Sequence, residues 1–325
     1  MPPSSTPDRF LLIGGRGWIA SHLHALLTAS HKNVLSTTVR MEDRTAMEAV
    51  CDNFNPTRVI CCAGFTGRPN VDQCEVRKQE TVMCNVTGLL MLAHLCWKRG
   101  VHLSVMSTGC IYTSTYTPDR TQLLSRPFTE DDPANFNGSF YSRTKAHVEE
   151  VVRHTYPNVL ILRVRMPISD DLHPRSFVTK ITKYEHVVNI PNSNSILHDL
   201  LPVAVAMSEQ EEVGVYNFTN PGAISHNEVL SLYQQIVDPG YSWKNFTLEK
   251  QAKVIKADRS NCELDCTKLM ALVKEYQGMG IDVEVPEIHE AYRRCFGRMR
   301  EEMSWKQGAE AGAALSSEAA VTVNI

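Results

Sequence analysis

The chain has 325 residues, of which 43% are hydrophobic, and a formal net charge of −3. This length and composition indicate a globular protein with room for one large or two medium domains. The small net charge and the lack of a long basic run argue against a nucleic-acid partner. No segment shows the basic amphipathic pattern of a membrane-surface helix. We therefore expect a small-molecule ligand.

The N-terminal residues 1–8 are rich in Pro and Ser and lack the basic and apolar regions of a secretory signal. No apolar run reaches the roughly 18 residues that a membrane span needs. The ten cysteines contain no CxxC pair and mostly lie in apolar segments, so we interpret them as reduced and structural. These features predict a cytoplasmic protein.

A glycine-rich turn follows the first predicted strand. Residues 10–13 are apolar and lead into GGRGWIA at 14–20, after which leucines recur at helical spacing. Strand, glycine turn and helix in this order are typical of a dinucleotide site. Gly14 would form the tight turn, Gly17 would let the backbone approach a pyrophosphate, and Ala20 would let the helix pack on the strand.

The second predicted strand, at 34–39, ends at Arg40, about 20 residues beyond the glycine turn. An acidic residue there would bind the ribose 2′-hydroxyl, whereas an arginine suits a 2′-phosphate. Arg40 therefore favours NADPH, with NADH as the alternative. A solvated surface arginine is the competing interpretation, because Glu42 and Asp43 lie nearby in the sequence.

The third predicted strand, at 58–62, ends in the small residues Ala63 and Gly64 and a polar loop. Open α/β sheets bind their ligands at such carboxyl ends of strands. We expect Ala63 and Gly64 to flank the cofactor, and Arg68 and Asn70 to reach the substrate. An ordinary loop salt bridge is the alternative for Arg68.

A long amphipathic helix is predicted at 80–98, with an apolar face for core or dimer contact. The next strand, at 101–106, runs into Thr108 and Cys110. Taken alone, Cys110 is best explained as a small buried hydrophobic residue. The following segment, 113–133, is polar and is predicted to be a loop over the site.

The segment at 139–150 predicts a helix that places Tyr141 and Lys145 on one face, four residues apart. This YxxxK pair follows the glycine turn by about 125 residues and Thr108 by about 33. That order is typical of a short-chain dehydrogenase/reductase. The three signals together predict an enzyme.

The sequence predicts an α/β fold, a Rossmann-type doubly wound parallel sheet with a smaller C-terminal substrate domain. A further strand at 160–165 ends in Met166 and Pro167, which should border the nicotinamide. The expected parts are a disordered N-terminus at 1–8, a nucleotide-binding domain at 9–166 with a returning strand at 213–218, a mainly substrate-binding part at 167–303, and a disordered tail at 304–325. We find no metal-ligand spacing.

Many separate strings, among them GRGWI, AGFTGRPNVD, STGCI, GSFYSRTK and RVRMPIS, resemble the nucleotide-rhamnose synthase/epimerase-reductases. These extended short-chain reductases also form the C-terminal half of plant rhamnose synthases. The resemblance covers about residues 10 to 270. It implies that a UDP- or dTDP-linked 4-keto-6-deoxyglucose, supplied by a separate 4,6-dehydratase, is epimerised at C3 and C5 and reduced at C4 with NADPH. It also implies a homodimer.

The resemblance assigns Thr108, Tyr141 and Lys145 to the reductive triad, and Cys110 and Lys180 to the epimerisation acid/base pair. The cofactor residues expected are Gly14, Arg16, Gly17, Trp18, Ile19, Arg40, Cys62, Ala63, Gly64, Asn85, Met106, Tyr141, Lys145, Met166 and Pro167. The substrate residues expected are Thr66, Arg68, Asn70, Thr108, Asn192, Ser193 and Arg259.

Alternatives stay open for several of these residues. Lys183 competes with Lys180, Arg259 could instead form a structural ion pair, and Asn192 and Ser193 could cap a helix. At the level of function, the rivals are a single-function 4-keto reductase, an enzyme like GDP-fucose synthase, and a regulatory subunit that binds nucleotide without catalysis.

Overall fold

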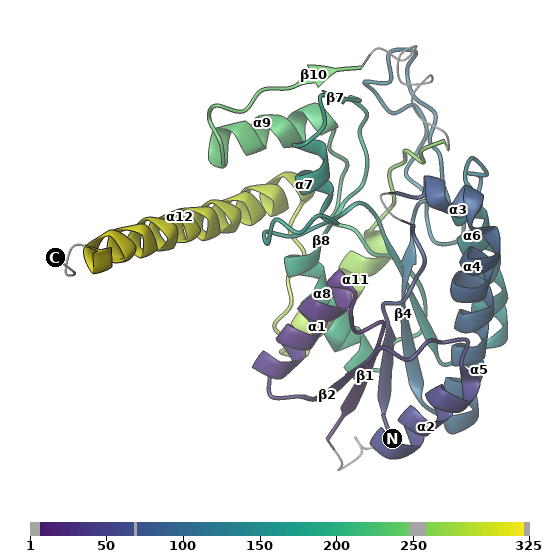
Figure 1. The fold of residues 1–325 in the computed structure, drawn as a ribbon. Coiled ribbons are helices and arrows are strands. Elements are labelled where there is room, and N and C mark those ends of the chain that lie inside the picture. The colour runs from purple at the N-terminus through teal and green to yellow at the C-terminus, as the bar shows by residue number, and fades with distance from the viewer. Residues whose placement is uncertain (1–6, 68–69, 247–257, 322–325) are drawn as a thin grey trace.

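The computed structural model describes residues 7–67, 70–246 and 258–321, with side chains described as far as residue 304. Arg68 and residues 1–6 of the expected disordered N-terminus lie outside the described part. Six parallel strands form the central sheet in the order β2-β1-β3-β4-β5-β9 (Figure 1). Their bounds are β1 Arg9–Ile13, β2 Asn33–Thr37, β3 Arg58–Cys61, β4 His102–Thr108, β5 Val159–Val164 and β9 Gly214–Asn217. This sheet confirms the predicted Rossmann-type fold, with the strand near 213–218 returning to it.

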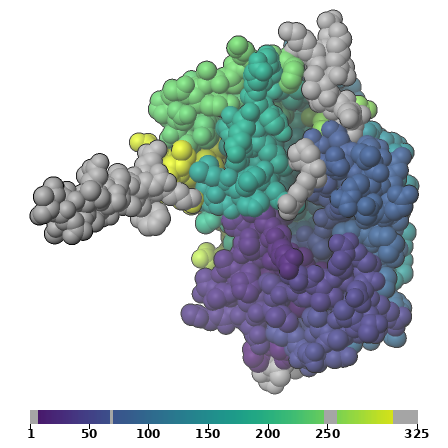
Figure 2. Space-filling model, viewed as in Figure 1, coloured from purple at the N-terminus to yellow at the C-terminus, as the bar shows by residue number. Residues whose placement is uncertain are grey.

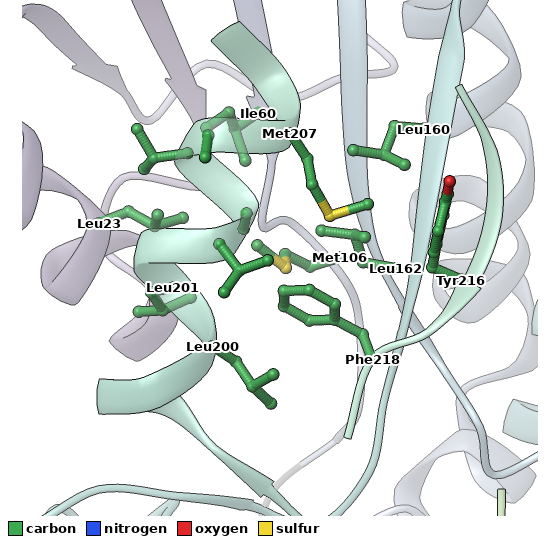
Figure 3. Close-up of a cluster of buried hydrophobic side chains, with 14 of the residues drawn as sticks. Leu23, Ile60, Met106, Leu160, Leu162, Leu200, Leu201, Met207, Tyr216 and Phe218 are labelled. Carbon is green, nitrogen blue, oxygen red and sulfur yellow. The ribbon is translucent and has the colours of Figure 1, made fainter. Parts of the chain in front are cut away.

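Apolar side chains alternate between the two faces of the sheet because successive residues of a strand point to opposite sides. Leu12 lies in one hydrophobic core, whereas Leu11 and Ile13 lie in the other. The core of Leu12 is covered by three helices: α1 Trp18–Ala29, α8 Leu197–Glu209 and α11 Thr267–Gly278. Figure 3 shows Met106 of β4 in this core, beside Met207 and Phe218.

The opposite face carries α2 Arg44–Phe54, α5 Leu89–Arg99 and α6 Phe140–Thr155 (Figure 1). The segment predicted as one helix at 80–98 consists of α4 Lys78–Val82, the π-helical η1 Met83–Gly88, and α5. A short helix, α3 Asp72–Val76, precedes them. π-helical turns are uncommon and concentrate at functional sites. Here the π-turn contains Asn85, which is 2% exposed.

The smaller part has a hydrophobic core of its own, to which Ile168, Val187, Ile196, Leu230 and Phe296 contribute. Its elements are β6 Pro167–Ile168, α7 Phe177–Ile181, β7 His186–Val187, β8 Ser195–Ile196, α9 His226–Ile236, β10 Lys244–Asn245 and the start of α12 Ile288–Val321. Helices α8 and α11 lie in the stretch expected to be mainly substrate-binding, but they pack on the central sheet instead.

Helix α12 extends away from the body of the protein (Figure 1). Its backbone remains helical to Val321, in contrast to the disordered tail expected from residue 304. The Ala and Glu content that suggested disorder also has high helix propensity, and the docked first turns provide a nucleus from which the helix continues. No helix in the described ranges is long and apolar enough to cross a membrane.

Candidate active site

The glycine turn packs closely against the loop that follows β3. Gly14 has a φ of 85°, and a Cβ added there would lie 2.9 Å from Ala63 Cα. Only glycine meets both conditions without strain. The Gly14 carbonyl accepts a hydrogen bond from Gly17 N–H at 2.7 Å, and Gly17 precedes α1 without a side-chain cap. The first N–H groups of α1 are therefore available to a pyrophosphate.

A pocket of about 610 Å³ lies beyond the end of β2 and is lined by Arg40, Glu42, Asp43 and Arg44, among others. Arg40 pairs with Glu42 at 2.5 Å, yet its side chain is 65% exposed. Such an exposed ion pair contributes little stability, so a ligand can replace it. Two guanidinium groups beside the adenosine end of a Rossmann site fit a 2′-phosphate.

Thr108, Cys110 and Tyr141 come together at the carboxyl end of β4. Thr108 is the last residue of that strand, and its side chain lies close enough to the Tyr141 phenol to lower the pKa of that phenol. The Cys110 N–H donates to Thr108 Oγ1 at 3.1 Å. The predicted junction of a reductase hydroxyl and a thiol is therefore present in the structure as one local cluster.

Helix α6 holds Tyr141 in its first turn through caps at its N-terminus. The Ser139 hydroxyl accepts a hydrogen bond from Ser142 N–H at 3.1 Å. Glu75 of α3 accepts a hydrogen bond from Phe140 N–H at 2.6 Å, which also places a negative charge at the positive end of the helix. The first turn of α6 is thus fixed from both sides.

Burial controls the ionisation of the Tyr141 and Lys145 side chains. It raises the pKa of the Tyr141 phenol, an effect that Cys110 reinforces and the hydrogen bond with Thr108 opposes. Burial lowers the pKa of Lys145, whereas the nearby Cys61, Glu149 and Cys84 side chains act to raise it. The phenol is therefore protonated at neutral pH and able to donate its proton. Lys145 stands one helical turn from Tyr141, as predicted.

Lys180 lies on α7 and is partly buried, whereas its competitor Lys183 is exposed beyond the end of that helix. Burial, and then the charge of Arg175, lower the pKa of Lys180. Arg175 Nη1 lies 3.5 Å from Thr66 Oγ1, so α7 adjoins the loop after β3. Within the described residues no contact joins Lys180 directly to Cys110. The partly buried environment favours Lys180 over Lys183.

Two residues expected to touch the cofactor have their side chains engaged elsewhere. Asn85 accepts a hydrogen bond from Phe65 N–H at 2.7 Å and donates to the Phe65 carbonyl at 2.9 Å, so its amide holds the loop after β3. Met106 packs in the core under the sheet and is 9% exposed (Figure 3). The Asn85 amide and the Met106 side chain thus have structural partners within the chain, and their contact with the cofactor stays a prediction.

The expected substrate residues Asn192 and Ser193 also have internal roles. Both are at most 1% exposed. Asn192 Oδ1 accepts hydrogen bonds from Arg165 and from Cys262 N–H, and Ser193 Oγ accepts one from Leu264 N–H. These bonds position the 262–264 segment, and the substrate contact of the two residues stays a prediction. The sequence could not separate these roles, because a polar turn suits either one.

Arg259 and Asn70 remain near the loop after β3. Arg259 Nη1 contacts Asp72 Oδ1 at 3.0 Å, which is the ion pair that we considered as its alternative role. The pair places Arg259 beside the loop after β3, and the Arg259 side chain is 32% exposed. Asn70 Oδ1 accepts a hydrogen bond from Asp72 N–H at 2.9 Å and so shapes the turn before α3.

The remaining cofactor candidates lie after β1, β3 and β5, at the carboxyl ends of these strands. Arg16 is exposed in the glycine turn, while Ile19 and Cys62 are partly buried against the core. Met166 adopts a positive φ of 38° directly after the β5 edge, a conformation that is unusual for a side chain of its size. Pro167 opens β6, which pairs with β8.

Trp18 was expected to bind cofactor, but its indole contacts the smaller part of the protein. Trp18 is 6% exposed, and its Nε1 donates to Asp171 Oδ2 at 3.0 Å. His22 also lies 3.0 Å from that oxygen, and His173 stacks on the indole at 5.2 Å. Asp171 was not identified from the sequence because its partner lies 153 residues away and no local pattern marks it.

The glycine turn, the parallel sheet and the Thr108–Tyr141–Lys145 arrangement define an extended short-chain dehydrogenase/reductase. The chain also matches the family model described as RmlD substrate binding domain over residues 8–275. It is 49% identical over 267 residues to the bifunctional dTDP-4-dehydrorhamnose 3,5-epimerase/dTDP-4-dehydrorhamnose reductase of Arabidopsis thaliana, covering 82% of this chain and 88% of that protein. The chain therefore belongs to the RmlD family, which confirms the resemblance seen in its motifs.

Other relatives agree with this assignment. The crystal structure of the L780 UDP-rhamnose synthase of Acanthamoeba polyphaga mimivirus superposes with a TM-score of 0.81 at 35% identity, covering 90% of this chain and 100% of that one. A trifunctional 4,6-dehydratase/3,5-epimerase/reductase of Arabidopsis thaliana is 46% identical over 82% of this chain, which spans 40% of that enzyme. The chain is an enzyme of this family.

Proposed function

We propose that this enzyme is a bifunctional 3,5-epimerase/4-reductase that converts UDP- or dTDP-4-keto-6-deoxyglucose to the corresponding nucleotide-L-rhamnose with NADPH. The observation that carries the proposal is that Cys110 follows β4 in the same cluster as Thr108 and Tyr141: its N–H donates to Thr108 Oγ1, and it raises the pKa of the Tyr141 phenol. A reductase needs the two hydroxyls, and an epimerase needs the additional acid/base group. The bifunctional Arabidopsis relative and the mimiviral UDP-rhamnose synthase support the same activity.

A single ketone can serve both reactions. The 4-keto group acidifies the hydrogens on C3 and C5, because loss of either one leaves an enolate with its charge on O4. Tyr141 and Thr108 would donate hydrogen bonds to O4 and stabilise that charge. The raised pKa of Tyr141 suits this role, since the phenol must stay protonated to donate.

Inversion at a carbon requires a proton to leave one face of the sugar and another to return on the opposite face. Two acid/base groups are therefore needed, one on each side of the ring. Cys110 and Lys180 fill these roles in our proposal. The lowered pKa of Lys180 brings the amine closer to the range in which it can exchange protons near neutral pH.

The reduction uses the same oxygen site. NADPH, when bound, supplies a hydride to C4. Tyr141 would then donate its proton to the alkoxide at O4, and Lys145 would hold the nicotinamide ribose. The pocket at Arg40 and Arg44 supports the choice of NADPH over NADH. We further propose that a separate 4,6-dehydratase supplies the keto sugar and that the enzyme works as a homodimer.

Product analysis in heavy water tests this proposal. The enzyme is incubated with NADPH and either UDP- or dTDP-4-keto-6-deoxyglucose, and the products are analysed by NMR for configuration and deuterium. We expect an L-rhamnose product with deuterium at C3 and C5. A reduced product without deuterium at these carbons would identify a single-function 4-keto reductase. Failure to oxidise NADPH with either sugar would favour a regulatory protein.

A pair of cysteine variants sharpens the test. Cys110→Ser should stop solvent exchange at C3 and C5 while NADPH affinity stays within a few-fold of the unmodified enzyme. Cys51→Ser is the matched control, since Cys51 is buried on α2 away from the site. Exchange that persists in Cys110→Ser near the normal rate would exclude the thiol as an acid/base group.

A further inference from the structure

Arg165 is a fully buried arginine whose guanidinium group contacts three separate segments of the chain. It follows β5 directly and is 0% exposed. Its Nη1 donates to the Gly109 carbonyl at 3.3 Å and to Ser260 Oγ at 2.7 Å. Its Nη2 donates to Asn192 Oδ1 at 2.5 Å and to the Ser260 carbonyl at 3.1 Å. One side chain thus joins the turn after β4 to two segments that are remote from it in the sequence.

The Ser260 hydroxyl extends these contacts to the far side of Cys110. It accepts a hydrogen bond from Arg165 and donates one to the Tyr112 carbonyl at 2.6 Å. Arg165 therefore contacts the residue before Cys110 directly, through the Gly109 carbonyl, and the second residue after Cys110 through Ser260. These contacts hold the turn on both sides of Cys110.

The peptide unit between Gly109 and Cys110 is held at both of its polar groups. Its carbonyl accepts a hydrogen bond from Arg165, and its N–H donates to Thr108 Oγ1 at 3.1 Å. A Cβ added at Gly109 would lie 2.9 Å from Arg165 Cγ and 2.6 Å from Leu264 Cδ1, so glycine permits this close packing. Because a peptide unit is planar, its orientation fixes the position of the Cys110 Cα. Arg165 and Thr108 together therefore determine where the Cys110 side chain begins.

The position of Thr108 depends less on Arg165 than the position of Cys110 does. Thr108 is the last residue of β4 and lies opposite Val164 of β5 in the sheet. The Gly109 N–H donates to the Val164 carbonyl at 3.0 Å and continues the ladder by one bond. Cys110 follows this last ladder bond. Loss of Arg165 should therefore displace Cys110 more than it displaces Thr108.

Arg165 is not arranged as a stabilising ion pair. Arg163, two residues earlier, is 1% exposed and donates twice to the Glu149 carboxylate, at 2.9 and 2.6 Å. In the described ranges the acceptors that contact Arg165 are all neutral, and its Nε has no acceptor. Burying a charge without an anion is costly, and an apolar side chain of similar volume would avoid that cost. The segments that Arg165 joins therefore explain the arginine better than stability does.

We propose that Arg165 is a positioning residue that fixes the turn after β4 and so places Cys110 for epimerisation. Because Arg165 has no exposed surface, it acts through the Gly109 carbonyl and Ser260 and not by contact with the sugar. A shift of a reacting group by about 1 Å can lower a rate by about 100-fold. The consequence for the reaction rests on the proposed function, whereas the placement of the turn can be measured without substrate.

The test compares two reactions in Arg165→Met. Exchange at C3 and C5 is measured by NMR with UDP- or dTDP-4-keto-6-deoxyglucose in heavy water. Reduction is measured as NADPH oxidation with the same nucleotide sugar already epimerised at C3 and C5. We expect exchange to fall about 10- to 100-fold, while reduction of the epimerised sugar stays within a few-fold of the unmodified enzyme. Arg165→Lys keeps a cationic donor and should lose less of the exchange rate.

Leu27→Ala is the control for a general loss of stability. Leu27 is 0% exposed in the core near the C-terminal end of α1, the opposite end from the glycine turn. Its truncation leaves a cavity, which destabilises the fold, and should lower exchange and reduction by the same factor. An equal loss of both reactions in Arg165→Met would identify a purely structural arginine and overturn the proposal. If Arg165→Met does not fold, Ser260→Ala decides in the same way, since it removes the hydroxyl between Arg165 and Tyr112 and should lower exchange more than reduction.

Amide hydrogen exchange in the substrate-free protein separates this proposal from the proposed function. Arg165→Met should speed amide exchange in a peptide of residues 109–112 and leave residues 102–108 of β4 unchanged. Equal uptake at 109–112 in the variant and the unmodified protein would overturn the positioning role. If the unmodified enzyme incorporates no deuterium into the sugar, the epimerase function fails, and the amide exchange still decides whether Arg165 holds the turn.

Discussion

The carboxylate of Asp171 accepts a hydrogen bond from the Trp18 indole at 3.0 Å and thereby connects the loop before α7 to the first turn of α1. The same loop leads into α7 and Lys180. In Figure 2 the teal surface of this region lies directly against the purple surface of the N-terminal residues. The helix end that suits a pyrophosphate therefore contacts the loop that leads into the helix carrying a proposed acid/base group.

Asp171→Asn tests this connection. Burial favours the neutral acid, but hydrogen bonds from His22 and Ser169 hold the pKa of Asp171 well below its usual range, so the native group is a carboxylate. Loss of one charge-assisted hydrogen bond weakens an interaction by roughly 1.5–3 kcal/mol. We expect the KM for NADPH to rise about tenfold or more and exchange at C3 and C5 to fall with it.

The neighbouring residue supplies a control for that variant. Asp170 pairs with Arg298 of α12 at 2.6 Å. In the described part of the chain it makes no hydrogen bond or ion pair with α1. Asp170→Asn should therefore leave the KM for NADPH nearly unchanged while it lowers thermal stability. Equal effects of the two variants on NADPH would show that the Trp18 contact does not matter for cofactor binding.

The pH dependence of epimerisation should report on Lys180 and Arg175. Burial and the Arg175 charge both lower the pKa of Lys180, so the ammonium form is lost at a lower pH than for a free lysine. Arg175→Gln removes one of these causes, and the Lys180 limb of the pH–rate profile should move to higher pH. Lys183→Gln, at an exposed position, should leave the limb in place. A movement to lower pH in Arg175→Gln would contradict the proposed coupling.

Local sequence patterns predicted those parts of the site that are formed by residues close together in the sequence. The glycine turn at 14–20 and the Tyr141–Lys145 spacing are of this kind, because a few adjacent residues determine a turn or one face of a helix. Arg165 and Ser260 form a hydrogen bond although they are 95 residues apart in the sequence, and no local pattern predicts such a contact. The hydrogen bonds that join Asn192 and Ser193 to the 262–264 segment were not predicted for the same reason.

Helix α8 was not predicted because it has no polar face to mark the helical period. Residues from Val203 to Ser208 are all buried, and Pro202 lies inside the helix. A helix segment that is buried on all sides has a continuous apolar sequence. Periodicity cannot distinguish such a sequence from a buried strand. The π-turn within the predicted helix at 80–98 was missed because Val82, Val86, Leu89, Leu90 and Ala93 keep an ordinary helical spacing across it.

Tyr141→Phe separates the reductase from the epimerase. The phenol is the proposed proton donor to O4, and loss of such a donor lowers a rate by about 10²–10⁴-fold. Thr108 remains next to the same oxygen site, so exchange at C3 and C5 should fall less than NADPH oxidation does. Both rates are measured in one heavy-water reaction by absorbance and NMR. Normal NADPH oxidation in the variant would remove Tyr141 from the mechanism.

Cofactor preference should depend on the pocket beyond β2. Arg40→Ala removes one of its two guanidinium groups, and a charge-assisted hydrogen bond to phosphate contributes roughly 1.5–3 kcal/mol. We expect kcat/KM for NADPH to fall about tenfold or more while the value for NADH changes little. Arg44→Ala should act in the same direction. An equal loss with both cofactors would mean that Arg40 has no contact with the 2′-phosphate.

The buried pair of Arg163 and Glu149 should dominate the stability of the sheet edge near the site. Its side chains are 2% and 5% exposed and 2.6 Å apart, and the Ser107 hydroxyl donates to the same carboxylate at 3.2 Å. Glu149→Gln leaves the buried Arg163 charge without the carboxylate that it pairs with, which costs about 3–5 kcal/mol. Urea unfolding should show this loss.

An exposed ion pair provides the matched comparison for Glu149. Glu48 pairs with Arg44 at 2.8 Å, with side-chain exposures of 36% and 63%. Since solvent screens this pair, Glu48→Gln should cost less than about 1 kcal/mol in the same urea experiment. If the two glutamine variants are equally stable, the Arg163 charge is compensated by its other acceptors, the Glu130 carbonyl and Asn217 Oδ1.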